Sequence, residues 1–291
     1  MGTLCELFGK TRQAYYQHIK YNYTVALKEE ILLQMIHKER KKMPRLGGRK
    51  LLHKIQPQLS KDLYLGRDLL FSFLRDHGLL VRRRRNRAIT TYSKHWLRKY
   101  PNLIKGIIPQ GPNQHWVADI TYIRIQEGFV YLSLITDAYS RKIIGWSLGI
   151  TLEARHSLEA LKMALKQLPR GVKSVYHHSD RGVQYCSQEY VNILQHNNFQ
   201  ISMTENGDPL ENAIAERVNG ILKDEWLNQI RFQTIDQVKD ALVEIIKTYN
   251  TERPHCSINF LTPQMAHQQS GVIKRKWKNY YKVKPKEVLV E

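Results

Sequence analysis

Three acidic residues stand out because each occupies a position where a carboxylate is unusual. Asp119 lies inside the apolar stretch 116–120, Asp180 follows a short predicted strand, and Glu216 lies on a long predicted helix. A buried carboxylate is costly unless it is paired or binds a metal. Asp119 alone therefore has two interpretations: a strand residue that faces water or an arginine, or a functional acid.

The spacing of these acids favours the functional interpretation. Thirty-five residues separate Asp180 from Glu216. Glu211 is the rival third acid, with 30 residues between it and Asp180. Its position near the predicted helix start favours an interaction with the helix dipole instead.

The elements that must position these acids predict an α/β fold. Three β-rich runs separated by short breaks predict antiparallel hairpins, and helices then alternate with short strands. The predicted strands cover residues 115–125, 129–137, 142–150, 175–178 and 199–202, and the helices cover 154–168, 188–196 and 210–229. This order predicts a mixed sheet with flanking helices.

Basic charge is concentrated at the two ends of the chain, which has 291 residues and a formal net charge of +20. Residues 1–110 hold 24 basic and 7 acidic side chains, residues 111–250 hold 14 and 16, and residues 251–291 hold 8 and 3. A near-neutral centre with basic ends indicates a core with arms that bind a polyanion. The densest basic run holds Arg82, Arg83, Arg84 and Arg85. We expect it to bind DNA phosphates, with a solvated linker as the alternative.

The amino-terminal region is predicted to be all helical. A short helix, a break at Gly9 and a second helix that begins after Thr11 and carries Arg12 form the pattern of a helix-turn-helix, although any helical hairpin shows it. A longer helix over about residues 25–41 follows. Two shorter helices then begin near Arg49 and residue 66. The expected domains are residues 1–42, 43–110, 111–230 and 231–291, the last with a helix from about 235 to 249 and a basic tail.

Several classes of protein are excluded. No run of 18 apolar residues exists, so the sequence predicts no membrane span. The first residues lack the build of a signal peptide, which predicts a cytoplasmic protein. Three cysteines lie far apart and form neither a disulfide framework nor a zinc motif.

Five motifs in order carry a resemblance to a known family. They are WVADITY (116–122), DAYSRK (137–142), HSDRGVQY (178–185), NAIAE (212–216) and YNTERPH (249–255). The chain resembles the DDE transposases of bacterial insertion sequences, in the retroviral-integrase superfamily, whose catalytic chain comes from the second reading frame. The resemblance covers nearly the whole chain. It implies a ribonuclease-H-like core and assigns metal binding to Asp119, Asp180 and Glu216.

The chemistry of such a site explains the residue types. Cutting a phosphodiester requires an activated water or 3′-hydroxyl and a stabilised leaving oxygen, which two Mg²⁺ ions about 3.5–4 Å apart can serve. Mg²⁺ prefers oxygen ligands, and Mn²⁺ is the expected substitute. Three carboxylates without metal repel one another, which raises at least one pKa. We therefore expect the region around Glu216 to become ordered when metal binds.

Neighbouring residues are expected to assist. Asn219 and Lys223 lie on the same helical face as Glu216, and we expect both to contact DNA; the alternative for Lys223 is an ordinary exposed lysine. His178 is expected beside the acids. Arg253 is expected in a structural brace that also touches DNA, with a brace alone as the alternative. Asp137 is expected to pair locally with Arg141.

The resulting hypothesis is a DNA transposase that binds terminal inverted repeats, cuts strands and joins them to target DNA. The alternatives are a ribonuclease-H-like nuclease without joining activity and a helix-turn-helix repressor. The expected partners are double-stranded DNA and further copies of the chain in a homodimer or higher oligomer. The product of an upstream reading frame stays open as a further partner.

Overall fold

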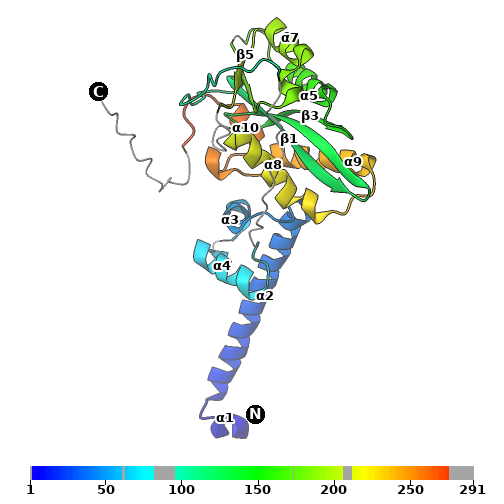
Figure 1. Ribbon diagram of the computed structural model, residues 1–291. Coiled ribbons are helices and arrows are strands. Elements are labelled where there is room, and N and C mark those ends of the chain that lie inside the picture. Colours follow the sequence, from blue (N-terminus) through cyan, green and yellow to red (C-terminus); the bar gives the residue numbers. More distant parts are fainter. Residues whose placement is uncertain (1, 61–62, 82–95, 173, 206–211, 275–291) are drawn as a thin grey trace, which may run out of the picture. The chain divides into compact units, whose positions relative to one another are not determined.

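The computed structural model describes residues 2–60, 63–81, 96–172, 174–205 and 212–274 (Figure 1). The chain divides into two compact units, residues 1–82 and residues 83–291. Each unit has its own buried apolar residues. The finer boundaries expected at residues 42, 110 and 230 stay predictions.

The first unit is helical throughout its regular elements, as the sequence predicted. These elements are α1 (Gly2–Leu7), α2 (Arg12–Lys42), α3 (Gly48–Ile55), the 3-10 helix η1 (Gln56–Gln58) and α4 (Arg67–Asp76). Its core comes from one face of each longer helix, where Ile36, Leu51 and Leu70 are completely buried. Lys54 and Glu39 join α3 to α2 through an ion pair of 2.9 Å.

Helix α2 corrects one expectation from the sequence. The Thr11 side chain caps it by accepting a hydrogen bond from the Ala14 backbone N–H at 3.1 Å, as predicted. The helix then runs for 31 residues without the expected interruption before residue 25. Residues 12–42 contain neither glycine nor proline, so no residue in this stretch ends the helix.

The second unit is built on a mixed five-stranded sheet. Its strands are β1 (His115–Ile125), β2 (Gly128–Asp137), β3 (Ile143–Gly149), β4 (Tyr176–Ser179) and β5 (Gln200–Met203). Their order is β3-β2-β1-β4-β5. The first three strands pair antiparallel, whereas β4 is parallel to β1 and to β5. This is the ribonuclease-H-like mixed sheet that the sequence predicted.

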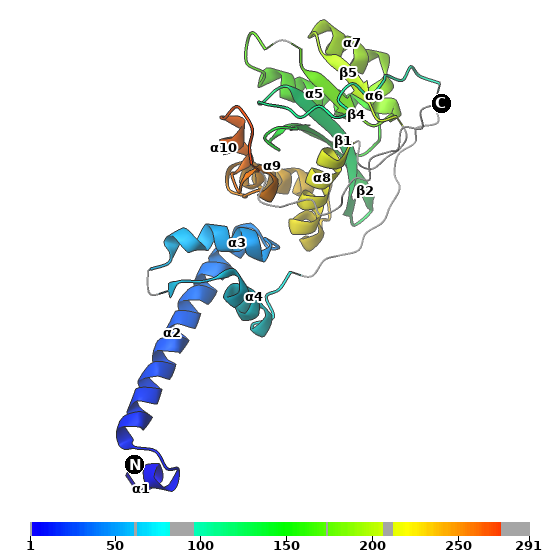
Figure 2. The same cartoon turned by 90° about the vertical axis from the view of Figure 1, so that its left-hand side faces the viewer.

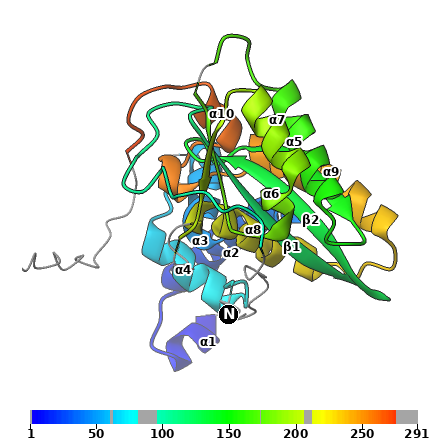
Figure 3. The same ribbon diagram turned by 45° about the horizontal axis from the view of Figure 1, so that its top comes forward.

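Helices cover both faces of the sheet (Figure 2). They are α5 (Ala154–Lys166), α6 (Val183–Cys186) and α7 (Gln188–His196) on one face and α8 (Ala213–Glu225) on the other. Alternation along β1 supplies both cores: Trp116 packs in the cluster with α5 to α7, whereas Val117 packs with Ala215 of α8. Figure 3 shows α5 and α7 side by side. A Cβ at Gly145 of β3 would collide with the Ala160 carbonyl oxygen, so this glycine lets α5 approach closely.

The chain after α8 braces the sheet. It forms the 3-10 helix η3 (Leu227–Gln229), α9 (Ile235–Thr251), the 3-10 helix η4 (Cys256–Ile258) and α10 (Pro263–His267). The apolar face of α9 is buried, as predicted. The Asn250 side chain ties α9 to β3 by donating to the Ile143 carbonyl at 2.9 Å and accepting from the Ile143 N–H at 3.0 Å. None of the described helices has both the length and the apolar character needed to cross a membrane.

Candidate active site

The end of strand β4 brings Asp180 beside Asp119. Strands β1 and β4 pair only over residues 115–117 of β1, because β4 ends at Ser179. Strand β1 continues to Ile125, and in the described structure its only further pairing on that side is an isolated bridge between Ile125 and Phe232. Asp119 lies at the start of this open edge, and Asp180 is the first residue after β4. Ligands of α/β sheets bind at such carboxyl ends of parallel strands.

The Asp119 carboxylate accepts hydrogen bonds at both oxygens, yet its surroundings destabilise the ionised form. Oδ1 accepts the Ile120 backbone N–H at 2.9 Å, and Oδ2 accepts the Asn219 side-chain N–H at 2.8 Å. Burial and then the charge of Asp180 raise the pKa of Asp119 to about 7, against the lowering effect of these hydrogen bonds; Glu216 adds a smaller rise. Such a carboxylate is stabilised by a proton or a bound cation.

The turn after β4 is built around the Asp180 side chain. Its Oδ1 accepts the Gly182 backbone N–H at 2.9 Å, and Gly182 is the N-cap of α6. A Cβ at Gly182 would lie only 3.0 Å from Asp180 Oδ1 and 3.0 Å from Gln184 Oε1. A larger residue would therefore require the Asp180 or Gln184 side chain to shift.

Helix α8 docks on β1 next to Asp119 and carries Glu216. Its N-cap residue, Asn212, donates from Nδ2 to the Ala118 carbonyl at 3.1 Å. Glu216 follows one turn later and is exposed; burial and the charge of Asp180 raise its pKa. Among the described residues, no three His, Cys, Asp or Glu side chains stand close enough to hold a metal ion.

A cavity of about 530 Å³ opens beside the two aspartates, within the size range of ligand sites. Asp119 and Asp180 line it, whereas Glu216 does not. Three aromatic side chains of the β1–β2 hairpin form another part of its lining, and we call them the aromatic wall: Tyr122, Phe129 and Tyr131. The site thus combines negative charge with flat apolar surface.

Lys223, seven residues after Glu216, contacts two of the residues that line this cavity. Its Nζ lies 3.8 Å from the centre of the Tyr122 ring and 3.3 Å from Thr121 Oγ1. Burial lowers the pKa of Lys223, while Asp224 and Asp119 oppose that effect. Lys223 is half-buried and so differs from an ordinary exposed lysine; its contact with DNA stays a prediction.

Asn219 has a different position from the one expected of a DNA contact. Only 4% of it is exposed, and its amide donates to Asp119. It therefore fixes the orientation of the Asp119 carboxylate. In the sequence, the only indication of this role was that Asn219 lies on the same helical face as Glu216.

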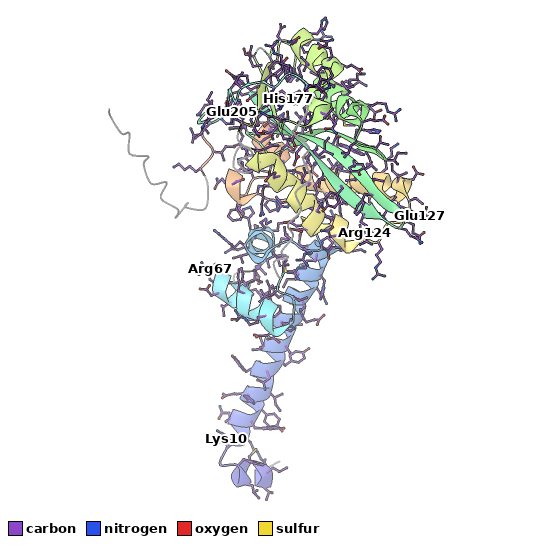
Figure 4. The ribbon with its side chains drawn as sticks, in the orientation of Figure 1. Lys10, Arg67, Arg124, Glu127, His177 and Glu205 are labelled. Carbon is purple, nitrogen blue, oxygen red and sulfur yellow. The ribbon has the colours of Figure 1, made fainter. Side chains whose placement is uncertain are left out.

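The two adjacent histidines of β4 are both buried (Figure 4 labels His177). His177 Nε2 lies 2.9 Å from the Tyr190 hydroxyl, and burial followed by the charge of His178 lowers the pKa of His177 to about 3. His177 is thus a neutral core residue. His178 Nδ1 lies 2.8 Å from Ser202 Oγ, which ties β4 to β5 two residues before Asp180. A role for His178 beside a bound ion stays a prediction.

Arg253 is a correction to the sequence-based expectation. Its side chain is 1% exposed and pairs with both oxygens of Glu225, at 2.6 and 2.8 Å. The guanidinium also lies 5.8 Å from the centre of the Tyr249 ring. A side chain enclosed in this way has no surface to offer DNA, so the alternative of a structural brace alone describes Arg253.

The remaining residues expected to bind DNA lie in the first unit or outside the described residues. Arg12 is the first residue of α2 and Arg49 the second residue of α3, and both are exposed. The run Arg82, Arg83, Arg84 and Arg85 and the tail over residues 275–291 lie outside the described residues. Glu211, the rival third acid, also lies outside them.

The aromatic wall was missed from the sequence. Tyr122 and Tyr131 stand directly opposite each other in the β1–β2 register. The short break between the two predicted strands limits that register, so the pair could have been found. The cavity beside them could not have been found from the sequence, because it depends on where β4 ends.

Comparisons with known proteins place these features in context. Residues 109–209 match the family described as integrase core domain, and residues 197–263 match a second family of the same description. The "Insertion element IS600 uncharacterized 31 kDa protein" of Shigella sonnei is 32% identical over 265 residues, 89% of this chain and 96% of that protein. "Transposase InsF for insertion sequence IS3A" of Escherichia coli (strain K12) is 35% identical over 193 residues, 66% of this chain and 67% of that protein.

Solved structures are also similar, and one of them serves as an example. The HTLV-2 integrase catalytic core domain in complex with magnesium (trimeric form) matches with a TM-score of 0.44 at 19% identity. The match covers 55% of this chain and 99% of that one.

Proposed function

Because this chain belongs to the insertion-sequence transposases with an integrase core domain, which are DDE-type polynucleotidyl transferases, we propose that Asp119, Asp180 and Glu216 are its catalytic triad. In this proposal it cuts DNA strands at the terminal inverted repeats of its element and transfers them to target DNA. The observation that carries the proposal is the pair of aspartates at the open edge of β1. They share one cavity, and the charge of Asp180 helps to raise the pKa of Asp119 to about 7.

The residues at this edge fit divalent ions of the Mg²⁺ type. The donors are carboxylate oxygens, the hard ligands that Mg²⁺ prefers. Burial and then the charge of Asp180 raise the pKa of Asp119, and a bound divalent cation would oppose both effects. Asp119, Asp180 and Glu216 would hold two ions, with Mn²⁺ as a substitute. When bound, these ions stabilise the attacking and leaving oxygens of an in-line displacement at phosphorus.

The chain's own residues prepare the site. The Ile120 N–H and the Asn219 amide each bind one oxygen of Asp119 and so fix the plane of that carboxylate. The Gly182 N–H does the same for Oδ1 of Asp180. Lys223 presents an ammonium group near the cavity, where it would bind the phosphate next to the cleaved bond. No serine, tyrosine or cysteine nucleophile is required.

The basic ends of the chain would supply most of the DNA affinity. Exposed Arg12 and Arg49, with the run over residues 82–85, would neutralise phosphates and orient the duplex. Two element ends must meet before joining, so a homodimer or a higher oligomer is the expected form. The product of an upstream reading frame is a further partner in this proposal, and the nucleoid is its expected place of action.

A cleavage and joining assay tests the proposal. Duplexes that carry the element's ends are incubated with the full chain and Mg²⁺, and cut and joined strands are separated. We expect both products from the unmodified chain and neither from Asp180→Asn. Asp236→Asn, at an exposed position of α9, is the matched control and should retain both.

Each alternative has its own result in this assay. Cut strands without joined strands would indicate a nuclease, and binding without either product would indicate a repressor. Full activity of Asp180→Asn would overturn the assignment of the triad.

A further inference from the structure

The aromatic wall has no task in the phosphoryl chemistry proposed above. Carboxylates, bound cations and N–H groups are sufficient to position a phosphodiester. Tyr122, Phe129 and Tyr131 nevertheless line the same cavity as Asp119 and Asp180. Aromatic surface beside a catalytic centre indicates a ligand that has flat, apolar faces of its own.

The hairpin geometry holds these rings together. Tyr122 of β1 is directly opposite Tyr131 of β2. Phe129 lies two residues before Tyr131 on the same face of β2, which makes it the diagonal neighbour of Tyr122. Directly opposite and diagonal side chains are both within contact distance across two strands. The rings of Tyr122 and Phe129 meet edge to face, with centres 5.3 Å apart and planes at 88°. Phe129 remains 49% exposed. The wall is therefore organised, and part of it is uncovered.

A cation lies over one ring of this wall and leaves the exposed Phe129 ring uncovered by it. The Lys223 ammonium lies 3.8 Å from the centre of the Tyr122 ring. A ligand that complements both features carries an anionic group next to a flat apolar ring. A nucleotide has this combination, whereas an apolar protein side chain lacks the anionic group.

The nucleotide must be unpaired. A base inside a duplex is stacked on both faces and cannot lie against another ring, but a base released from its pair can. Stacking on a protein aromatic ring stabilises a bound base by about 1–3 kcal/mol. That gain offsets part of the cost of unpairing, which is a few kcal/mol.

We propose that the aromatic wall stacks against the base of one unpaired DNA nucleotide, while Asp119 and Asp180 face the adjoining phosphodiester and Lys223 faces a phosphate. This inference rests on the proposed function, because it takes DNA as the substrate. It adds that the strand is opened at the site of reaction, so the enzyme selects end duplexes that unpair there.

Binding to designed duplexes tests the inference in the unmodified full chain. The probes are an end duplex that is fully paired, one with a mismatch at the nucleotide next to the cut bond, and one with an abasic site in that mismatch. A fourth carries the mismatch in its interior. Ca²⁺ replaces Mg²⁺, so that affinity is measured separately from turnover.

We expect the mismatch next to the cut to tighten binding about 5-fold to 150-fold, which corresponds to 1–3 kcal/mol of stacking. The abasic site should remove that gain, and the interior mismatch should give none. Equal affinity for the paired, mismatched and abasic probes would overturn the inference, as would equal gains from the two mismatch positions.

Substitutions locate the effect. Phe129→Leu keeps apolar volume without a flat ring and should lose the preference for the mismatch, whereas Phe129→Tyr should keep it. Val243→Ala removes a side chain of the same 49% exposure on α9 and is the matched control. An undiminished preference in Phe129→Leu would contradict a stacking role. If Phe129→Leu fails to fold, as judged by thermal melting, the probe comparison on the unmodified chain decides.

The inference and the proposed function fail separately. If the chain prefers the mismatch but yields no cut or joined strands in Mg²⁺, the proposed function is refuted and the stacking of a base on the aromatic wall is still supported. A chain that cuts and joins but binds all probes equally refutes the base site alone.

Discussion

Two aspartates in the second unit, Asp119 and Asp137, have opposite environments. Asp137 is completely buried at the end of β2 and accepts hydrogen bonds from the Asn113 and Ser140 backbone N–H groups at 2.7 Å each and from Ser140 Oγ at 2.6 Å. Burial alone would raise its pKa, but hydrogen bonds from His267 and Ser140 outweigh that effect and lower it. The pKa of Asp119 is instead raised to about 7.

The difference separates a carboxylate that stabilises the fold from one suited to a ligand. Asp137 is surrounded by donors, and the His267 ring nitrogen lies 3.7 Å from its Oδ1. The side-chain carboxylate is thus paired with Asn113, Ser140 and His267, while the local pairing with Arg141 that the sequence suggested is made by the backbone, where the Arg141 N–H donates to the Asp137 carbonyl at 2.9 Å. Asp119 has two donors, and burial together with the charge of Asp180 destabilises its ionised form.

The same substitution at the two aspartates should have opposite consequences for activity. Asp119→Asn removes a proposed ligand and should lower strand cleavage on the order of 10⁴-fold, the scale seen when one member of a catalytic unit is lost. Asp137→Asn should leave activity within about 10-fold under conditions where the protein is folded. Cleavage rates on an end-bearing duplex measure both, and equal losses would contradict the comparison.

The Arg253–Glu225 pair extends the comparison to a second fully partnered charge. Arg253→Ala leaves Glu225 buried without its partner, which should lower the free energy of unfolding by about 3–5 kcal/mol. Denaturant unfolding checks this value, and DNA affinity of the folded variant should be unchanged. If Arg253→Ala instead loses much DNA affinity and keeps normal stability, Arg253 contacts DNA despite its burial.

The pH dependence of stability should also separate the two aspartates in metal-free protein. The folded-state pKa of Asp119 is about 7 against an ordinary value of 3.8, so the folded protein binds more protons and its stability falls as pH rises from about 4 to 7. The free energy of unfolding should fall by on the order of 2–4 kcal/mol over this range. This is less than the full difference in pKa implies, because the Asp119 side chain is only half-buried. Asp119→Asn should flatten it.

Asp137 acts in the opposite direction. Its folded-state pKa is lowered, so its contribution to stability is present above its ordinary pKa and is lost as pH falls through the folded-state value. Asp137→Asn should therefore reduce the loss of stability on acidification. Thermal melting of both variants between pH 3 and 8 measures the two effects, and curves that move together would contradict them.

The smallest expected effect concerns the residue that orients Asp119. Asn219→Ala removes the donor to Oδ2, and loss of such a partner of a metal ligand costs about 10–100-fold in metal affinity or activity. Titration with Mn²⁺ measures it. Gln188→Ala, an exposed amide on α7, is the control and should bind Mn²⁺ normally.

Regular elements with clear periodicity were predicted closely from the sequence. The bounds of β1 and α7 were predicted to the residue, because hydrophobic runs and polar breaks define them. The four-residue helix α6 was missed because one turn carries no periodic signal. Helix α8 begins at Ala213 instead of residue 210 within the described chain.

Contacts between elements could be predicted less well. Placing Asn219 and Lys223 on the face of Glu216 needs only helix geometry. That Asn219 reaches Asp119 and Lys223 reaches Tyr122 depends on how α8 docks on β1. Likewise, nothing local to Arg253 indicates Glu225 as its partner, because 28 positions separate them.

Divalent-ion binding tests the central claim most directly. Mn²⁺ affinity is measured by calorimetry for the unmodified chain, for Asp119→Asn, Asp180→Asn and Glu216→Gln, and for Asp137→Asn as the control. The account predicts saturable binding that each of the three triad substitutions weakens at least about 10-fold and that Asp137→Asn leaves intact. Equal binding by all five proteins, or no binding by the unmodified chain, would contradict it.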